Sequence, residues 1–176
     1  MSKLRWFAPL TLAGALLGAS GLSGSASAAS GPVPCSGTGS FGPTTAPVVR
    51  SVGGETLVSF PFAGLHPYCP APGGIADVTA RIDGTLNEEI TAQGHFDLNF
   101  AETMTLPDGS TDQWRGEASG TVATSGLLDV SVSEVRTVGT ATGQLAGVVG
   151  NGTFEITGFG GSGFEFADEI SYIYSK

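Results

Sequence analysis

Apolar and polar positions alternate along most of the chain after residue 45, in runs that end at glycine, asparagine, aspartate or proline. Val, Thr, Ile and Phe dominate these runs, and no segment beyond the first 28 residues has the repeat of an amphipathic helix. This pattern is typical of many strands joined by short turns. We expect strands over 46–52, 55–62, 75–82, 85–91, 95–106, 110–123, 127–138, 140–149, 153–158 and 163–174.

Three triplets that end in glycine separate four of these runs. They are Ala92-Gln93-Gly94, Pro107-Asp108-Gly109 and Thr124-Ser125-Gly126. A three-residue hairpin loop commonly ends in a left-handed residue, where glycine is favoured. The triplets therefore predict an up-and-down meander whose loops are closed by the pairs Thr91–His95, Leu106–Ser110 and Ala123–Leu127.

The predicted register gathers even-numbered residues on one face, which is mostly apolar. This face holds Leu86, Glu88, Ile90, Phe96, Leu98, Phe100, Glu102, Met104, Leu106, Trp114, Gly116, Ala118, Gly120, Val122, Leu128, Val130 and Val132. Large side chains meet small ones across two strands: Phe96 opposite Gly120, Leu98 opposite Ala118 and Phe100 opposite Gly116. Such pairing favours a strongly curved sheet.

The length of the strands, each with one apolar face, favours closure over an open sheet with bare edges. Asn151-Gly152 is a type I′ turn signal between 145–149 and 154–158, and segment 163–174 supplies a last strand. The predicted fold class is all-β, an antiparallel up-and-down β-barrel of about eight strands. A two-sheet β-sandwich is the alternative.

The glycine-rich run Thr140–Phe154 (TATGQLAGVVGNGTF) also bears on the fold. It resembles the hairpin of secreted barrels in the allene-oxide-cyclase and dirigent group, and of related bacterial lipocalin-like barrels. The resemblance covers about one hairpin. It implies an antiparallel barrel with an apolar pocket, and it transfers no catalytic residue to this chain.

The N-terminus has the three parts of a secretory signal: basic Lys3 and Arg5, an apolar stretch over 6–18, and the small residues Ala26-Ser27-Ala28. We expect residues 1–28 to be a cleaved signal peptide, 29–45 a Gly/Ser/Pro-rich segment, and 46–176 a single barrel domain. No later segment is long and apolar enough to span a membrane, so the mature chain is expected to be secreted. Cys35 and Cys69 fit a disulfide that ties segment 29–45 to the barrel.

The chain is acidic, with a net charge of −9 from seven basic and sixteen acidic residues. Loss of Lys3 and Arg5 with the signal peptide makes the mature charge −11. Nucleic acid and anionic membrane surfaces both require basic residues, so neither is an expected partner. The charge favours solubility, and the sequence carries no indication of oligomeric state.

Some polar residues share the apolar face. In the predicted register Glu102, Trp114 and Arg136 form a row, with Glu134 one step away. Arg136 would lie on the Trp114 ring and reach Glu102, giving a barrel mouth that orients a polar ligand group or supports acid–base chemistry. Alternatively, a β-bulge near Ser133 would turn Val135 inward and send Glu134 and Arg136 to solvent.

Metal and cofactor chemistry find little support in the sequence. The two histidines, His66 and His95, are too few for a three-histidine zinc site; we expect His66 in a loop and His95 on the surface beside a turn. The Gly158–Gly163 run has the spelling of a dinucleotide motif but no following helix. We expect no metal and no cofactor.

Three functions remain open. The leading one is a barrel that binds a small, partly apolar molecule among Phe96, Phe100, Glu102, Trp114 and Arg136. The second is a barrel isomerase, cyclase or hydrolase that uses Glu102 or Glu134 as acid–base. The third is an extracellular structural or interaction protein without a pocket.

Overall fold

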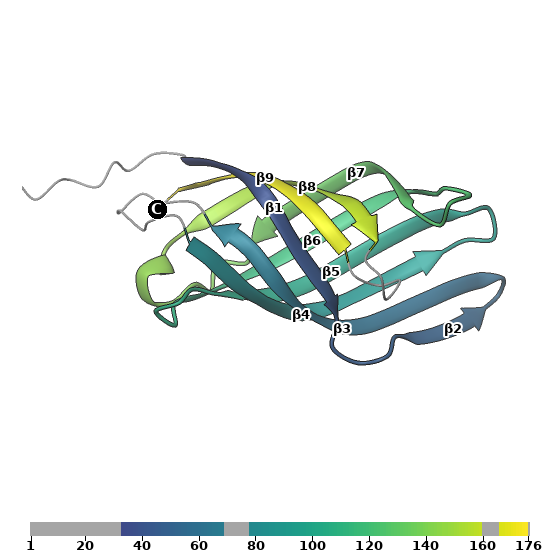
Figure 1. The fold of residues 1–176 in the computed structure, drawn as a ribbon, viewed down its shortest axis with the longest axis horizontal. Coiled ribbons are helices and arrows are strands. Elements are labelled where there is room, and N and C mark those ends of the chain that lie inside the picture. Colours follow the sequence, from purple (N-terminus) through teal and green to yellow (C-terminus); the bar gives the residue numbers. More distant parts are fainter. Residues whose placement is uncertain (1–32, 69–77, 160–165, 176) are drawn as a thin grey trace, which may run out of the picture.

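The computed structural model describes residues 33–68, 78–159 and 166–175. Within them, nine strands form one antiparallel sheet (Figure 1). The strands are β1 (Val33–Pro43), β2 (Val48–Val52), β3 (Glu55–Tyr68), β4 (Val78–Ile90), β5 (His95–Thr105), β6 (Thr111–Val122), β7 (Leu128–Thr137), β8 (Val149–Phe159) and β9 (Phe166–Ser175). A short 3₁₀ helix, η1 (Gly143–Leu145), lies between β7 and β8.

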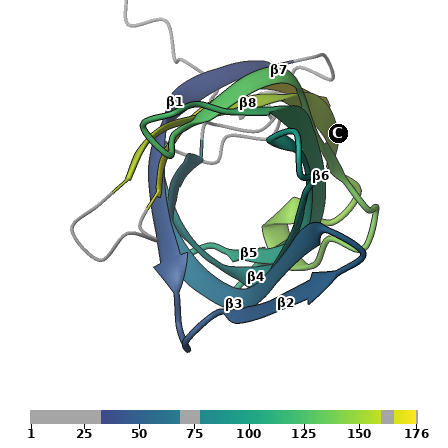
Figure 2. The ribbon, with the colours of Figure 1, turned by 90° about the vertical axis from the view of Figure 1, so that its right-hand side faces the viewer.

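The sheet closes because β1 pairs with two neighbours, β9 on one side and β3 on the other. The ring order is β1-β9-β8-β7-β6-β5-β4-β3, and β2 adds to the edge of β3 outside this ring. Seen along its length, the sheet encircles a common interior (Figure 2). The predicted all-β barrel of eight strands is therefore confirmed.

The three predicted hairpin loops all form. Thr91 N–H donates to the His95 carbonyl at 2.8 Å, and the other two closing pairs make the same bond: Leu106 to Ser110 at 2.9 Å and Ala123 to Leu127 at 2.8 Å. The glycines at the third loop positions have φ of 77°, 85° and 83° at Gly94, Gly109 and Gly126. Left-handed φ is costly for residues with a side chain, which explains glycine at each of these loop ends.

The predicted register of β5 and β6 is also confirmed, including Phe96 opposite Gly120, Leu98 opposite Ala118 and Phe100 opposite Gly116. A side chain at Gly116 would collide with the Phe100 ring. Large inward residues therefore lie over residues with little or no side chain, and this lets the sheet curve tightly enough to close.

The register of β7 differs from the prediction because a β-bulge precedes its middle. Ser119 pairs with Val132 but Gly120 pairs with Val130, which leaves Ser131 without an opposite residue. One inserted residue reverses the faces beyond it. The inward placement of Glu134 and Arg136 was therefore wrong, as was that of Val132, which is 57% exposed. The bulge alternative was the right one, two residues earlier than Ser133.

Residues 33–43 belong to the barrel, although the sequence placed them in a segment outside it. β1 is held through its backbone by two neighbours, and such pairing needs no alternation of apolar and polar residues. Gly64 of β3 leaves space for β1 to approach, because a side chain there would collide with the Ser40 carbonyl and Phe41. Closure of the barrel thus depends on a glycine-rich crossing.

Three further boundaries differ from expectation. Segments 75–82 and 85–91 join, as far as they are described, into the single strand β4, since Gly84 continues the ladder. Segment 140–149 is mainly a loop around η1. Asn151 and Gly152 lie inside β8, so the predicted type I′ turn is wrong.

The β7–β8 connection closes one end of the interior. Leu145 and Val148 in it are completely buried. Two hydrogen bonds attach the connection to neighbouring elements. In the β5–β6 turn, Ser110 Oγ accepts from the Gln144 backbone N–H at 2.9 Å. On β6, the Thr111 carbonyl accepts from the Thr142 N–H at 2.7 Å. The β7–β8 connection, which the sequence predicted to be a strand, therefore fills one end of the interior with its apolar residues. We call this connection the plug.

Two sequence predictions lie outside the described residues. The signal peptide, 1–28, falls in the undescribed N-terminal part, and Cys69 is also outside the described ranges, so the Cys35–Cys69 disulfide remains a prediction. Within the described part, no helix has the length and hydropathy needed to cross a membrane.

The close packing of β4 on β5 gives a stability prediction. A methyl group at Gly84 would meet the Ala101 carbonyl and the Glu102 backbone, neither of which can turn aside. We expect Gly84→Ala to lower the free energy of unfolding by about 1–3 kcal/mol, measured by urea denaturation. The matched control Thr85→Ser, exposed on the same strand, should change it by less than about 0.5 kcal/mol. Equal stability of the two variants would contradict the register.

Candidate functional site

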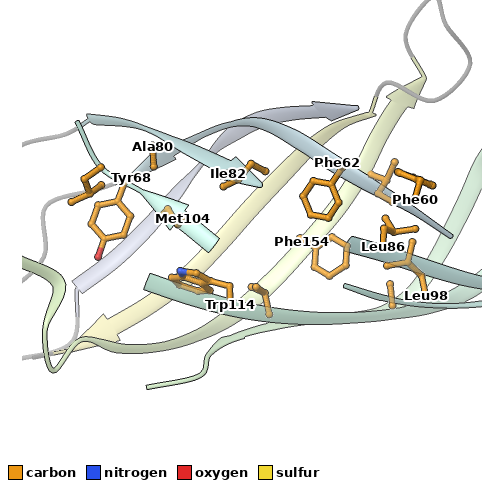
Figure 3. Packing of buried hydrophobic residues seen from close by; sticks show 14 of the residues in the cluster. Phe60, Phe62, Tyr68, Ala80, Ile82, Leu86, Leu98, Met104, Trp114 and Phe154 are labelled. Atoms are coloured by element: carbon orange, nitrogen blue, oxygen red, sulfur yellow. The ribbon is translucent and has the colours of Figure 1, made fainter. Parts of the chain in front are cut away.

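Four phenylalanine rings meet in the middle of the barrel interior. Phe41 and Phe62 have ring centroids 5.1 Å apart, Phe62 and Phe100 are 6.3 Å apart, and Phe100 and Phe154 are 5.2 Å apart. They come from β1, β3, β5 and β8, so strands far apart in sequence supply one aromatic cluster. The rings of Phe62 and Phe154 can be seen within the barrel, with Leu86 beside them (Figure 3).

A small cavity of about 20 Å³ lies among these rings. That volume has room for about one water molecule. Its lining is apolar apart from two side chains, His66 and Glu102. The lining residues are Phe41, Phe62, His66, Leu86, Leu98, Phe100, Glu102, Val135, Phe154 and Ile156.

His66 and Glu102 are a buried pair, 3% and 6% exposed. His66 Nδ1 lies 4.0 Å from Glu102 Oε1. β4 separates their strands and places small residues opposite them, Ala80 opposite His66 and Gly84 opposite Glu102. The separation exceeds a hydrogen bond, and the adjacent cavity has room for a water that bridges the two groups.

The pair accounts for a carboxylate inside an apolar barrel. Burying an ionised group is costly unless a charged or hydrogen-bonding partner accompanies it. The sequence assigned that part to Arg136, but Arg136 is exposed and pairs across the sheet with Arg115. His66 takes its place beside Glu102.

Sequence reasoning missed His66 because Pro67 and Cys69 nearby suggested a loop. A signal was nevertheless present: apolar residues at even positions of β3 continue through Phe60 and Phe62 to Tyr68, and His66 keeps that phase. Extending the strand past 62 would have placed the histidine inside the barrel.

The structure places some of the other predicted site residues in the interior and some on the outer surface. Phe96 and Trp114 are buried at 1% and 2% exposure, and Phe100 is half-buried. Trp114 lies directly opposite Glu102, at the end of the interior where Tyr68 and Met104 also lie (Figure 3). Glu134 is exposed on the outside together with Arg136, so neither shares the interior with Glu102.

Among the side chains that the structure describes, two further carboxylates point into the barrel. Asp112 follows Thr111, which is hydrogen-bonded to the β7–β8 connection, and it is completely buried. Neither of its carboxylate oxygens has a hydrogen-bond partner of normal geometry in the described part of the chain. Burial raises its pKa to about 6, while the Gln113 backbone N–H offsets a part of that effect. Glu88 lies half-buried opposite Leu98, and burial raises its pKa too.

Asp108, by contrast, is exposed and its pKa is lowered, because its carboxylate accepts from the Ser110 backbone N–H, the Ser110 hydroxyl and Gln144. These bonds stabilise the β5–β6 turn against the plug. No three His, Cys, Asp or Glu residues lie together as a possible metal site among the residues that the structure describes.

Comparison with known proteins identifies a fold and no family. No family model matches the chain, and no curated protein matches it. In fold the chain is similar to a DUF3224-family protein of unknown function from Shewanella oneidensis, with 17% identity and a TM-score of 0.50, over 82% of this chain and 99% of that one. This likeness supports the barrel fold alone.

A pterocarpan synthase dirigent protein is also similar, at 15% identity and a TM-score of 0.46, over 82% of this chain and 86% of that one. A likeness of that strength supports no conclusion about this chain. The sequence resemblance to the dirigent group covered Thr140–Phe154, and that run is a loop with η1 and the start of β8. The predicted hairpin is therefore absent from those residues.

Asp112 gives a prediction about pH. Its folded pKa of about 6 exceeds its usual value of 3.8, so the folded protein binds the proton more tightly and stability falls as pH rises from about 4 to about 6. We expect Asp112→Asn to raise the free energy of unfolding at pH 7 by on the order of 1–3 kcal/mol and to have little effect at pH 4. Denaturation of both proteins across this range measures the difference. A destabilising effect of Asp112→Asn at pH 7 would contradict an unpaired buried carboxylate.

Proposed function

We propose that the barrel binds one small, largely apolar molecule that carries a hydrogen-bonding group. The apolar body lies among Phe62, Phe100 and Phe154, and the polar group takes the place of water beside His66 and Glu102. The observation that carries this proposal is the cavity, which is lined by four phenylalanines, four aliphatic residues and two buried polar side chains, His66 and Glu102.

The energetic cost of burying His66 and Glu102 supports a functional role for this pair. A histidine and a glutamate in an apolar interior usually contribute less to stability than apolar residues of the same volume would. Binding sites for small molecules commonly combine apolar walls with a few polar groups that orient the ligand. His66 and Glu102 supply the polar groups in this barrel.

Room for the ligand comes from rearrangement, since the cavity holds only about one water as it stands. The Phe100 ring is half-buried and can turn away more easily than a fully packed ring. Access is supported by the β7–β8 seam, where the two strands pair only through Val135–Gly152 and Arg136–Asn151 in the described residues. Val135 lines both the cavity and a groove of about 440 Å³ outside the seam.

Acid–base catalysis is the second candidate. It is favoured by one observation, the 4.0 Å approach of His66 Nδ1 to Glu102 Oε1 inside the barrel. An imidazole and a carboxylate that share a dry cavity are suited to moving a proton on a bound molecule. Glu134 and Arg136 face outward, so they have no role in this catalytic candidate.

We also propose that the protein acts outside the cytoplasm. The N-terminal signal sequence and the pair of cysteines support this location.

The binding proposal is tested with the neutral fluorophore N-phenylnaphthylamine. We expect saturable binding of one equivalent with a rise in fluorescence. Phe100→Ala should tighten binding by on the order of tenfold, because removal of the ring enlarges the cavity. Glu102→Gln should weaken it several-fold, whereas the control Glu89→Gln, exposed on β4, should leave it unchanged.

Absence of saturable binding in both the natural protein and Phe100→Ala would overturn the proposal. Circular dichroism of each variant confirms that the barrel is intact before binding is measured.

Secretion is tested by expressing the full chain in a bacterial host and measuring, by mass spectrometry, the molecular mass of the protein recovered from the exported fraction. We expect the mass of a chain that begins at Ala29 and has lost two hydrogens to a Cys35–Cys69 bond. Recovery of the whole chain, Met1 included, from the cytoplasm alone would contradict the proposed location.

A further inference from the structure

Four of the charged side chains on the outer face of β6 and β7 form two rows. Arg115 lies opposite Arg136, and Glu117 lies opposite Glu134. All four are exposed. We call these residues the charge block.

The charge block is not neutralised within the chain. None of its four side chains makes an ion pair within 4.0 Å in the part of the chain that the structure describes. Like charges directly opposite each other are unfavourable in an antiparallel sheet, and opposite charges in those positions are favourable. If Arg136 and Glu134 exchanged places, both cross-strand pairs would join opposite charges. The observed arrangement is therefore less stable in the isolated molecule than the exchanged one would be.

The two rows are complementary to each other. A two-fold axis that runs between the arginine row and the glutamate row, parallel to both, places the arginines of one molecule over the glutamates of another. The same patch then meets itself in a closed dimer, as is usual for homodimers. Four intermolecular charge pairs result from this single operation.

The surroundings of the block fit such contact. It lies between two grooves of about 640 Å³ and 440 Å³, and three of its side chains, Arg115, Glu117 and Glu134, line both. Val132, 57% exposed beside Glu134, lines both as well and adds an apolar contact. The charge block and the grooves that it lines therefore form one continuous surface that a second molecule can contact.

We propose that this face binds a second copy of the same chain, through reciprocal contacts of Arg115 and Arg136 with Glu117 and Glu134. The proposal is independent of ligand binding in the interior. The net charge of −9 opposes self-association, so local attraction between the blocks must exceed a general repulsion. Salt weakens both effects: screening of the contact pairs favours dissociation, and screening of the repulsion favours association.

The test uses two charge variants of the full chain and sedimentation velocity. Arg115→Glu/Arg136→Glu makes the block entirely acidic, and Glu117→Arg/Glu134→Arg makes it entirely basic. We expect each variant alone to be monomeric under conditions where the natural protein dimerises, with a dissociation constant raised at least about tenfold. An equimolar mixture should form a heterodimer.

Matched controls carry the same change of net charge away from the block. They are Arg50→Glu/Arg81→Glu and Glu55→Arg/Glu155→Arg, whose residues are all exposed on other strands. The arginine control changes net charge without touching the contact, so it should retain far more dimer than its matched variant.

Rising salt should dissociate the natural dimer. A natural protein that is monomeric at every concentration tested, a mixture that stays monomeric, or a dimer that strengthens with salt would each overturn the proposal.

Discussion

Everything described for the interior depends on backbone pairing of β1 with two partners, β9 and β3. Without it the sheet would keep two open edges, and its apolar face would remain in water. Closure converts that face into an interior in which His66 and Glu102 are almost removed from solvent. A weak sequence feature, a strand of glycine, serine and proline, therefore sets the dielectric environment of the candidate site.

The closed interior is not uniformly stabilising. Asp112 is buried without a hydrogen-bond partner of normal geometry among the described residues, and the His66–Glu102 pair occupies space that apolar side chains would fill at lower cost. Within the described residues, the β7–β8 ladder consists of Val135–Gly152 and Arg136–Asn151, and the Gly150 N–H also donates to Thr137 Oγ1 at 2.9 Å. Buried polar groups of this kind lower the stability of an interior relative to a fully apolar one. The interior is therefore a packed apolar cluster that encloses one small cavity beside a buried polar pair.

Sequence reasoning succeeded where turn chemistry determines register. The loops at Gly94, Gly109 and Gly126 fix the phase of β4 to β6 from either end, so the inward faces of Phe96 and Trp114 followed from counting residues. The same count correctly placed the Glu102 carboxylate inside the barrel.

It failed where a position is decided by backbone pairing or by distant contacts. The bulge at Ser131 inserts one residue with no marker in its residue type, and it reverses Val135, Glu134 and Arg136. β1 was missed because its pairing is through the backbone, and His66 was missed because its strand was ended too early.

The coupling between His66 and Glu102 is the most direct test of this account, and a double-mutant cycle measures it. The free energy of unfolding is determined for the natural protein, His66→Asn, Glu102→Gln and the double variant. Interaction across the interior predicts a coupling energy of about 1–3 kcal/mol. Effects that add to within about 0.3–0.5 kcal/mol would show that the two side chains do not interact, and would contradict the site described for this barrel.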